Sequence, residues 1–226
     1  MPLIDADDPH AKPPRIPVVA PGAAWTGPLD VDRGWAELDG VELRGQAIDL
    51  SGCDELSITD GVLSGVGLGA GERPVVEIRS STFDGCDLSQ ARITSIHRSR
   101  LDGCKLAGTD LSAAVLTDVV FERCSLRYVN LRMARLTRVG FVDCTFDEVD
   151  AYQLEAQDVA FDRSRLSALN VDRLTAIRVD LRGAVELDLR GVGRLDGCLV
   201  AHHQLPALAP LLALAVGLDL ERPPGD

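Results

Sequence analysis

Apolar side chains recur at every fifth residue through the middle of the chain. The series is unbroken from Leu101 to Leu181, and a second small or aliphatic side chain stands two residues before almost every member. Neither an α-helix nor a flat strand has this period. Two of every five residues are therefore predicted to point into a core. The later members include weaker core formers, such as Ala151, Ala156 and Ala176.

A second period of twenty residues is superimposed on the first. Phe121, Phe141 and Phe161 are twenty residues apart, and Cys104, Cys124, Cys144 and Ser164 form a parallel series. Four sides of five residues would make one coil, and stacked coils would be separated by the β-strand spacing of about 4.8 Å. The pattern therefore predicts a four-sided β-solenoid in which identical positions form ladders.

The same pattern runs from Leu38 to Ile93 in a different register and slips by three residues across residues 94–100. The steps from Phe83 to Leu101 and from Cys86 to Cys104 are both eighteen residues. One coil is therefore predicted to lack two residues while its ladders stay aligned. The glycine-rich stretch 65–74 interrupts the period, and we expect a bulged corner or a loop there.

Three stretches carry a family resemblance: CDLSQARI (86–93), CKLAGTDLSAAVL (104–116) and CSLRYVNLRMARL (124–136). They resemble the A(D/N)LXX consensus of pentapeptide-repeat proteins, and the resemblance extends over roughly residues 36–200. It implies an all-β fold, a right-handed quadrilateral β-helix packed internally by stacked Leu and Phe.

The two ends of the solenoid need caps, since each coil buries its faces only against its neighbours. Residues 1–34 form a proline-rich acidic leader, predicted to be partly disordered or an N-terminal cap, with Trp25 and Trp35 over the first coil. Residues 35–200 are the predicted solenoid. Residues 201–226 are predicted to form a C-terminal helix and tail that serve as a cap or dimerisation module.

One helical stripe supports the prediction for the C-terminal module. It consists of Leu205, Leu208, Leu212, Ala215 and Val216. This helix should cover the last coil, a second subunit, or both. Among gyrase-directed relatives a C-terminal module mediates two-fold dimerisation, so the resemblance implies a homodimer, with a simple cap as the alternative.

The formal charge of −12 and the pI near 4.7 argue against direct binding of nucleic acid, because phosphate neutralisation requires clustered Lys and Arg. On the side centred on Phe121 and Phe141, the flanking positions form a predicted acidic strip. Its members are Asp84, Asp102, Glu122, Asp143, Asp162 and Asp180. The neighbouring side alternates Asp118, Arg138, Asp158 and Arg178, which we interpret as self-neutralising structure.

Stacked carboxylates repel one another, so the acidic strip is the better candidate for function. The resemblance implies that such a strip imitates the DNA backbone. It also implies that the protein binds and modulates or protects DNA gyrase or another type II topoisomerase, with resistance to a topoisomerase poison as the expected outcome. Arg123 and Arg163 lie on the same side and dilute the strip. A protein-interaction scaffold with an unrelated target therefore stays open as the alternative.

No motif predicts catalysis, a cofactor or a metal site. The run Gly65–Gly71 lacks the Gly-Lys-Ser/Thr ending of a phosphate-binding loop, and the adjacent His202 and His203 lack zinc-ligand spacing. Carboxylate pairs such as Asp147 and Glu148 would lie on a convex exterior. Without a recognisable signal sequence or membrane span, we expect a cytoplasmic protein with free thiols.

Overall fold

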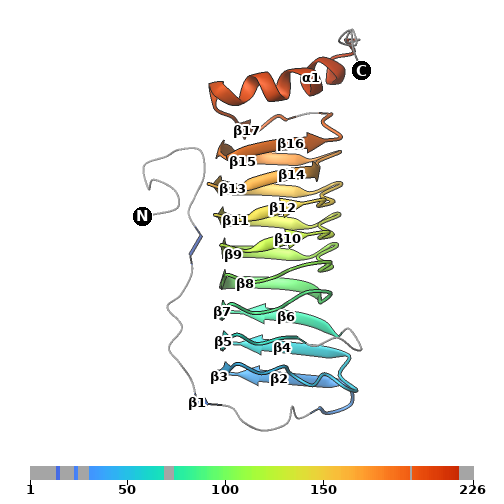
Figure 1. The fold of residues 1–226 in the computed structure, drawn as a ribbon. Coiled ribbons are helices and arrows are strands. Elements are labelled where there is room, and N and C mark those ends of the chain that lie inside the picture. Colours follow the sequence, from blue (N-terminus) through green and yellow to red (C-terminus); the bar gives the residue numbers. More distant parts are fainter. Residues whose placement is uncertain (1–13, 16–22, 25–30, 69–73, 194, 219–226) are drawn as a thin grey trace, which may run out of the picture.

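In the computed structural model, the β-strands wind into a four-sided tube, a right-handed quadrilateral β-helix, with one helix at its C-terminal end (Figure 1). The structure describes residues 14–15, 23–24, 31–68, 74–193 and 195–218. All pairings between the named strands are parallel, as expected when each coil stacks on the one before. The predicted fold class is confirmed.

The elements follow one another in a regular order. The strands of the first coils are β1 Ala23–Ala24, β2 Trp35–Asp39, β3 Val41–Arg44, β4 Glu55–Thr59, β5 Val62–Ser64, β6 Val75–Arg79, β7 Thr82–Asp84 and β8 Arg92–Asp102. The later elements are β9 Val115–Glu122, β10 Ser125–Arg127, β11 Arg135–Val142, β12 Thr145–Asp147, β13 Glu155–Asp162, β14 Arg165–Asn170, β15 Thr175–Gly183, β16 Glu186–Arg190, β17 Cys198–Leu199, a 3-10 turn η1 His202–Gln204 and α1 Leu205–Ala215.

The strand register confirms the predicted period of twenty. Phe121 pairs with Phe141, and Phe141 with Phe161, while Leu136 pairs with Leu116 below and with Ala156 above. We number the sides in chain order from their central residues. Side 1 is centred on Leu101, Phe121, Phe141 and Phe161; side 2 on residues 106, 126, 146 and 166; side 3 on residues 111, 131, 151 and 171; side 4 on residues 116, 136, 156 and 176.

The interior is built from the two inward positions of each side. Phe121 and Phe141 are at most 2% exposed, and their rings stack with centroids 5.0 Å apart. Phe141 and Phe161 stack at 5.1 Å, and Phe146 meets Phe141 edge-on at 5.0 Å. The coil spacing of about 4.8 Å is close to the preferred separation of offset-stacked rings, so the backbone ladder and the aromatic ladder reinforce each other.

Each corner in the regular coils bends through one residue in the left-handed conformation. This residue stands two positions after the central residue of a side: at the corner between sides 4 and 1, Asp118, Arg138 and Asp158 have φ between 53° and 56°. Glycine occupies the equivalent position at Gly103 and Gly108, where this conformation has the lowest cost. The sharp turns give the tube its four flat sides.

The shortened coil lies where the sequence predicted it. Phe83 pairs with Leu101, eighteen residues later, and the register shifts beside Val76. The inward residues Ile93 and Ile96 are only three positions apart, and β8 passes continuously through the corner between sides 3 and 4. Loss of two residues at one corner therefore leaves every other ladder aligned.

The inward hydroxyl side chains Ser99, Thr109 and Ser164 are small and donate hydrogen bonds to backbone carbonyl oxygens. The Cys144 thiol lies 3.4 Å from the carbonyl oxygen of Phe121, and Ser164, one coil above, donates to the carbonyl oxygen of Phe141 at 3.1 Å. The predicted cysteine ladder is thus a packing column, and its thiols are free. Hydrogen bonding to neighbouring thiols and burial raise the pKa of Cys104, and burial raises that of Cys198 to about 11, so both stay protonated.

The last coil is covered by the segment that leads into α1. The Gln204 side chain is buried and donates to the carbonyl oxygens of Leu181 and Ala184 at 2.9 and 3.0 Å. These bonds satisfy two carbonyl groups that have no further strand above them. Leu208, 1% exposed, packs on the core beneath the helix.

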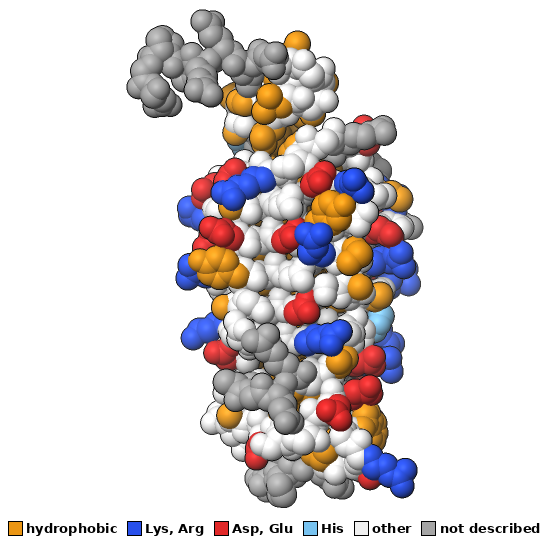
Figure 2. Space-filling model, turned by 90° about the vertical axis from the view of Figure 1, so that its right-hand side faces the viewer, with side chains coloured by type: hydrophobic (Ala, Val, Ile, Leu, Met, Phe, Trp, Pro, Cys, Tyr) orange, Lys and Arg blue, Asp and Glu red, His pale blue; other side chains and the backbone are white. Residues whose placement is uncertain are grey.

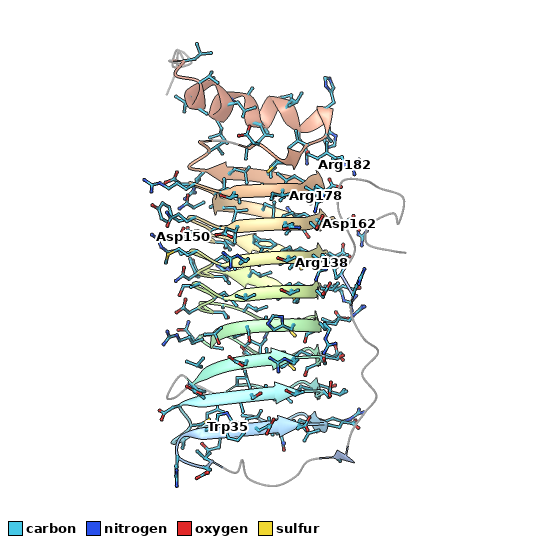
Figure 3. All side chains as sticks on the ribbon, turned by 180° about the vertical axis from the view of Figure 1, so that it is seen from behind. Trp35, Arg138, Asp150, Asp162, Arg178 and Arg182 are labelled. Atoms are coloured by element: carbon cyan, nitrogen blue, oxygen red, sulfur yellow. The ribbon has the colours of Figure 1, made fainter. Side chains whose placement is uncertain are left out.

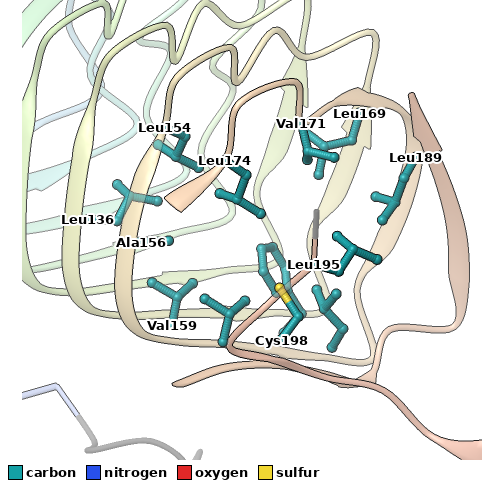
Figure 4. Close-up of a pocket in the computed structure, with 13 residues that line it drawn as sticks. Leu136, Leu154, Ala156, Val159, Leu169, Val171, Leu174, Leu189, Leu195 and Cys198 are labelled. Carbon is teal, nitrogen blue, oxygen red and sulfur yellow. The ribbon is translucent and has the colours of Figure 1, made fainter. Parts of the chain in front are cut away.

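A small apolar cavity lies inside the last coils (Figure 4). It has a volume of about 40 Å³ and is lined by side chains that include Leu136, Ala156 and Cys198. Ala156 follows Leu116 and Leu136 in one ladder, so the missing side-chain carbons leave space that neighbouring coils do not fill.

Ala156→Val should stabilise the solenoid by about 1 kcal/mol, since filling the cavity recovers roughly 24 cal/mol per Å³. Chemical unfolding followed by circular dichroism would measure the change. Ala134→Val is the matched control, because Ala134 is inward, fully buried and outside the cavity. Overpacking there should destabilise. Equal effects of the two variants would contradict this account of the cavity.

Candidate interaction surface

A column of alternating charge runs along the corner between sides 4 and 1. Its members are Arg98, Asp118, Arg138, Asp158 and Arg178, all with positive φ. Arg138 forms a bidentate ion pair with Asp118 at 2.6 and 2.7 Å, and Arg178 forms one with Asp158 at 2.5 and 2.8 Å. These ion pairs confirm the prediction of self-neutralising structure. Figure 3 shows two members of the column, Arg138 and Arg178.

The carboxylates of this column are more buried than an outward position suggests. Asp118 is 7% and Asp158 only 1% exposed. Burial alone would raise the pKa of Asp118, but hydrogen bonds from the Arg138 guanidinium and from the main chain of Arg15 outweigh it and lower the pKa. The carboxylate of Asp118 is therefore held ionised by its partners.

The predicted acidic strip occupies three different positions on side 1. Asp84, Asp102 and Glu122 stand in one column and are paired by the strand register. Asp162 belongs to the same column, but Val142 stands between it and Glu122, and Asp143 lies one residue further, at the corner. Asp180 pairs with Ala160 and lies on the opposite flank of the side.

Arginines compensate most of the strip. Arg100 and Arg123 both bind Glu122, the latter at 2.8 Å, and both also lie within ion-pair distance of Asp102. Arg163 bridges Asp143 and Asp162 at 2.8 and 2.5 Å. Arg182 binds Asp180 at 2.6 Å. Among the described residues, Asp84 is the member of the strip without an ion pair.

Burial disfavours the ionised form of the Asp102 carboxylate in this strip. Burial raises the pKa of Asp102 despite the nearby Arg123, and its Oδ1 atom has no hydrogen-bond partner. Like charges one coil spacing apart repel by about 1 kcal/mol even at the dielectric constant of water. The arginines of side 1 therefore serve the stability of the stack, and they leave little net charge for a partner.

The strongest negative charge lies on the first two coils, which the strip did not include. Residues 35–68 contain seven acidic residues and one arginine, a net charge of −6. By contrast, residues 94–200 contain sixteen acidic and fifteen basic residues. Counting charges by coil would have located this acidic end. Its acidic members are Glu37, Asp39, Glu42, Asp49, Asp54, Glu55 and Asp60, all exposed except the half-buried Glu42.

The linear charge density of the acidic end can be compared with that of duplex DNA. Residues 35–68 make about two coils, or roughly 10 Å of the rod, so the density is about one negative charge per 1.6 Å. Double-stranded DNA carries one per about 1.7 Å. One face of the remaining rod shows acidic and basic side chains interspersed instead (Figure 2). Among the coils that the structure describes, the acidic end is the part whose charge density approaches that of a duplex.

An exposed tryptophan stands within the acidic end. Trp35 opens β2, pairs with Glu55 of β4, and is 46% exposed. The prediction that Trp35 covers the first coil is therefore not met by the described residues, and Trp25 lies outside them. Tryptophan is enriched at the energetic centres of protein interfaces. Charge and an aromatic side chain thus coincide at this end of the rod (Figure 3).

The C-terminal stripe is divided between two environments. Leu208 is buried against the last coil and Leu212 is half-buried. Leu205 and Val216 are 40% and 74% exposed, and Ala215 is also exposed. The helix therefore packs on the core through Leu208 and keeps further apolar surface in the solvent.

The remaining candidates form no site. His202 and His203 are exposed side chains of η1. No group of three potential metal ligands occurs among the described residues, and none of the helices described there is long and apolar enough to cross a bilayer. Residues 69–73 of the glycine-rich run are not among the residues that the structure describes.

Ladder register, four corners per coil and inward Leu or Phe define a quadrilateral β-solenoid. A family profile described as "Pentapeptide repeat region" matches residues 94–171. Residues 94–171 therefore match the pentapeptide-repeat family that the sequence pattern resembles. Comparison with curated proteins gave no match.

Solved structures with similar features are distant in sequence. Full-length QnrB1, a plasmid-mediated fluoroquinolone resistance protein, is 17% identical, and the match covers 79% of this chain and 99% of that one with a TM-score of 0.31. HetL from Nostoc sp. strain PCC 7120, involved in heterocyst differentiation regulation, is 14% identical over 73% of this chain and 89% of HetL, with a TM-score of 0.34. At these TM-scores neither likeness carries a functional argument.

Asp158→Ala should cost about 1–3 kcal/mol of unfolding free energy, because it removes two charge-assisted hydrogen bonds from a nearly buried site. Glu155→Ala is the matched control on the same side. The Arg135–Glu155 pair has side chains more than half exposed, so its loss should matter far less. Denaturant titration would compare the variants. A larger loss for Glu155→Ala would show that the corner column is not a stabilising feature.

Proposed function

We propose that this chain is a non-catalytic binding protein that presents the acidic end of its rod to a basic, DNA-binding groove of a type II topoisomerase such as DNA gyrase. The observation that carries the proposal is the charge on residues 35–68, whose density is close to that of duplex DNA. A basic groove would attract this end over long range and raise the rate of association. The family resemblance names the class of enzyme.

In this proposal the acidic end and Asp84 of the strip face the partner together. Asp84 has no ion pair among the described residues, whereas arginines pair with the members of the strip from Asp102 onward. The partner therefore meets the N-terminal coils first, with Trp35 as the apolar anchor. The consequence for the cell is tolerance of a topoisomerase poison.

A homodimer through α1 is part of the same proposal. Leu205, Leu214 and Val216 are 40–74% exposed, and residues 204–218 carry no charged side chain. A second copy would cover this surface, since large exposed apolar patches are rare on monomers. The dimer would place its two acidic ends far apart, at opposite ends of a longer rod.

The alternative is a scaffold whose target is unrelated to topoisomerases. The observation that favours it is the near-balance of charge over residues 94–200, which makes most of the rod unlike a phosphate backbone.

Supercoiling and poisoned-cleavage assays with purified gyrase test the proposal. Wild-type protein at micromolar concentration should inhibit supercoiling or protect against the poison. Reversal of three exposed charges, Glu37→Lys, Asp39→Lys and Glu55→Lys, should weaken the effect at least tenfold, because attraction becomes repulsion.

A charge-matched control separates this site from net charge. Reversal at Asp147, Glu148 and Glu186 changes the net charge equally but lies far along the rod, and should leave the effect within about twofold. No effect of the wild-type protein would reject the topoisomerase proposal. Equal losses in both triple variants would reject the acidic end as the site.

A further inference from the structure

Net charge alternates between whole coils in the middle of the rod. The coil of residues 123–142, which we name the arginine coil, contains five arginines and no acidic residue. The next coil, residues 143–162, which we name the carboxylate coil, contains seven acidic residues and no lysine or arginine. Ion pairs join the two coils within the chain, as between Arg132 and Asp150 at 2.8 Å. The rod therefore presents a basic band beside an acidic band.

Side 3 combines the boundary between these bands with large exposed side chains. Tyr128 and Met133 of the arginine coil are 57% and 54% exposed, and they stand at the two corners that bound side 3. Tyr152 of the carboxylate coil is half-buried, and the Arg132 guanidinium lies 4.5 Å from its ring centroid. Figure 3 labels Asp150, which lies on the same side. Because tyrosine, methionine and arginine are enriched in the cores of protein interfaces, side 3 has the composition of a contact surface.

One outward column of side 3 is complementary to its own reverse. Along the chain this column reads Asp110, Asn130, Asp150 and Asn170. Read in the opposite direction, amides and carboxylates exchange places, so a second rod facing side 3 in the opposite direction would set an amide opposite every carboxylate. Within one chain, Asn130 donates to Asp110 at 3.0 Å and Asn170 donates to Asp150 at 2.9 Å. An amide nitrogen has two N–H groups, so each also has a donor for a partner.

The same inversion matches the other side chains of the two coils. We place a two-fold axis between two antiparallel rods, perpendicular to them and level with the boundary between the arginine and carboxylate coils. Each residue then faces, in the second copy, the residue twenty positions away in the sequence. Arg132 faces Tyr152 of the second copy, the same pairing that it makes within its own chain. Tyr128 faces Glu148 of the second copy. Such a two-fold contact forms twice, once in each direction.

Two parallel rods in register lack this complementarity. They would set the arginine coil of one copy against the arginine coil of the other, and the carboxylate coil against the carboxylate coil. Like charges at close range repel one another even in water. The alternation of charge between coils therefore selects the antiparallel arrangement, in which each basic band meets an acidic band.

We propose that side 3 of residues 103–182 is a contact surface for a second copy of this chain, packed face to face and antiparallel. The contact spans four coils, or about 19 Å of the rod. This area is smaller than that of a standard protein interface, so the association is weak and depends on concentration. The pair has one acidic end at each of its two ends. The inference depends neither on the proposed topoisomerase partner nor on contacts of α1.

Exchange of charge between two variants tests the contact by analytical ultracentrifugation of the full chain. The first variant carries Tyr128→Glu and Arg132→Glu, and the second carries Glu148→Arg and Tyr152→Arg. Each variant alone should associate at least about tenfold more weakly than the parent, because like charges then meet across the interface. An equimolar mixture should recover the affinity of the parent to within about threefold, because the reversed charges face each other.

Two controls isolate side 3 in this experiment. The parent and both variants carry Leu214→Glu and Val216→Glu, so that charge on exposed apolar positions removes association through α1. Circular dichroism melts show that the variants are folded, as expected for changes at exposed and half-buried positions. A parent that stays monomeric at the highest soluble concentration would overturn the proposal, and so would a mixture that associates no more tightly than its components.

Chemical crosslinking tests the antiparallel orientation and keeps every charge of side 3. A mixture of the Met133→Cys and Gln153→Cys proteins, treated with a short bismaleimide, should give a covalent heterodimer, because these positions face each other between copies. Neither protein alone should give this product. Ser125→Cys mixed with Thr145→Cys, the equivalent neighbours on side 2, is the matched control and should give none. Equal crosslinking of Met133→Cys alone, or no product in the first mixture, would contradict the antiparallel contact.

Discussion

The in-register stacking of coils at the strand spacing is the constraint on which the rest of this protein depends. Each inward side chain must tolerate its equivalents directly above and below, at about 4.8 Å. Phenylalanine rings stack favourably at 5.0–5.1 Å, and thiols or hydroxyls reach the backbone carbonyl oxygens of neighbouring strands. Because each coil packs only against the coils next to it, a poorly packed residue in one coil destabilises both neighbours.

The same constraint governs the exterior, where it limits how charge can be displayed. A column of identical charges would accumulate repulsion of about 1 kcal/mol per step. The chain avoids this by alternation at the corner of sides 4 and 1, and by arginine pairs on side 1. On side 3 it alternates amides with acids, as where Asn130 donates to Asp110 at 3.0 Å. Among the described residues, the net negative charge is greatest on the first two coils, which makes that end of the rod distinct.

Most of the fold could be predicted from the sequence because, in a solenoid, residues separated by one coil length in the sequence are neighbours in the structure. The position of Phe141 between Phe121 and Phe161, and the shortened coil between Phe83 and Leu101, follow from counting residues. The site was less predictable. Which arginine reaches which carboxylate depends on side-chain geometry, and the contact of Arg15 with Asp118 joins segments that share no period. The burial of Val142 likewise has no signal in the repeat itself.

The most direct test of the stacked-ladder account is the thermal unfolding of Phe141→Asp, followed by circular dichroism. The account predicts loss of the cooperative β-type transition, because a charge placed between Phe121 and Phe161 would be buried without a partner. A variant that keeps the wild-type spectrum and a cooperative transition near the wild-type temperature would contradict it.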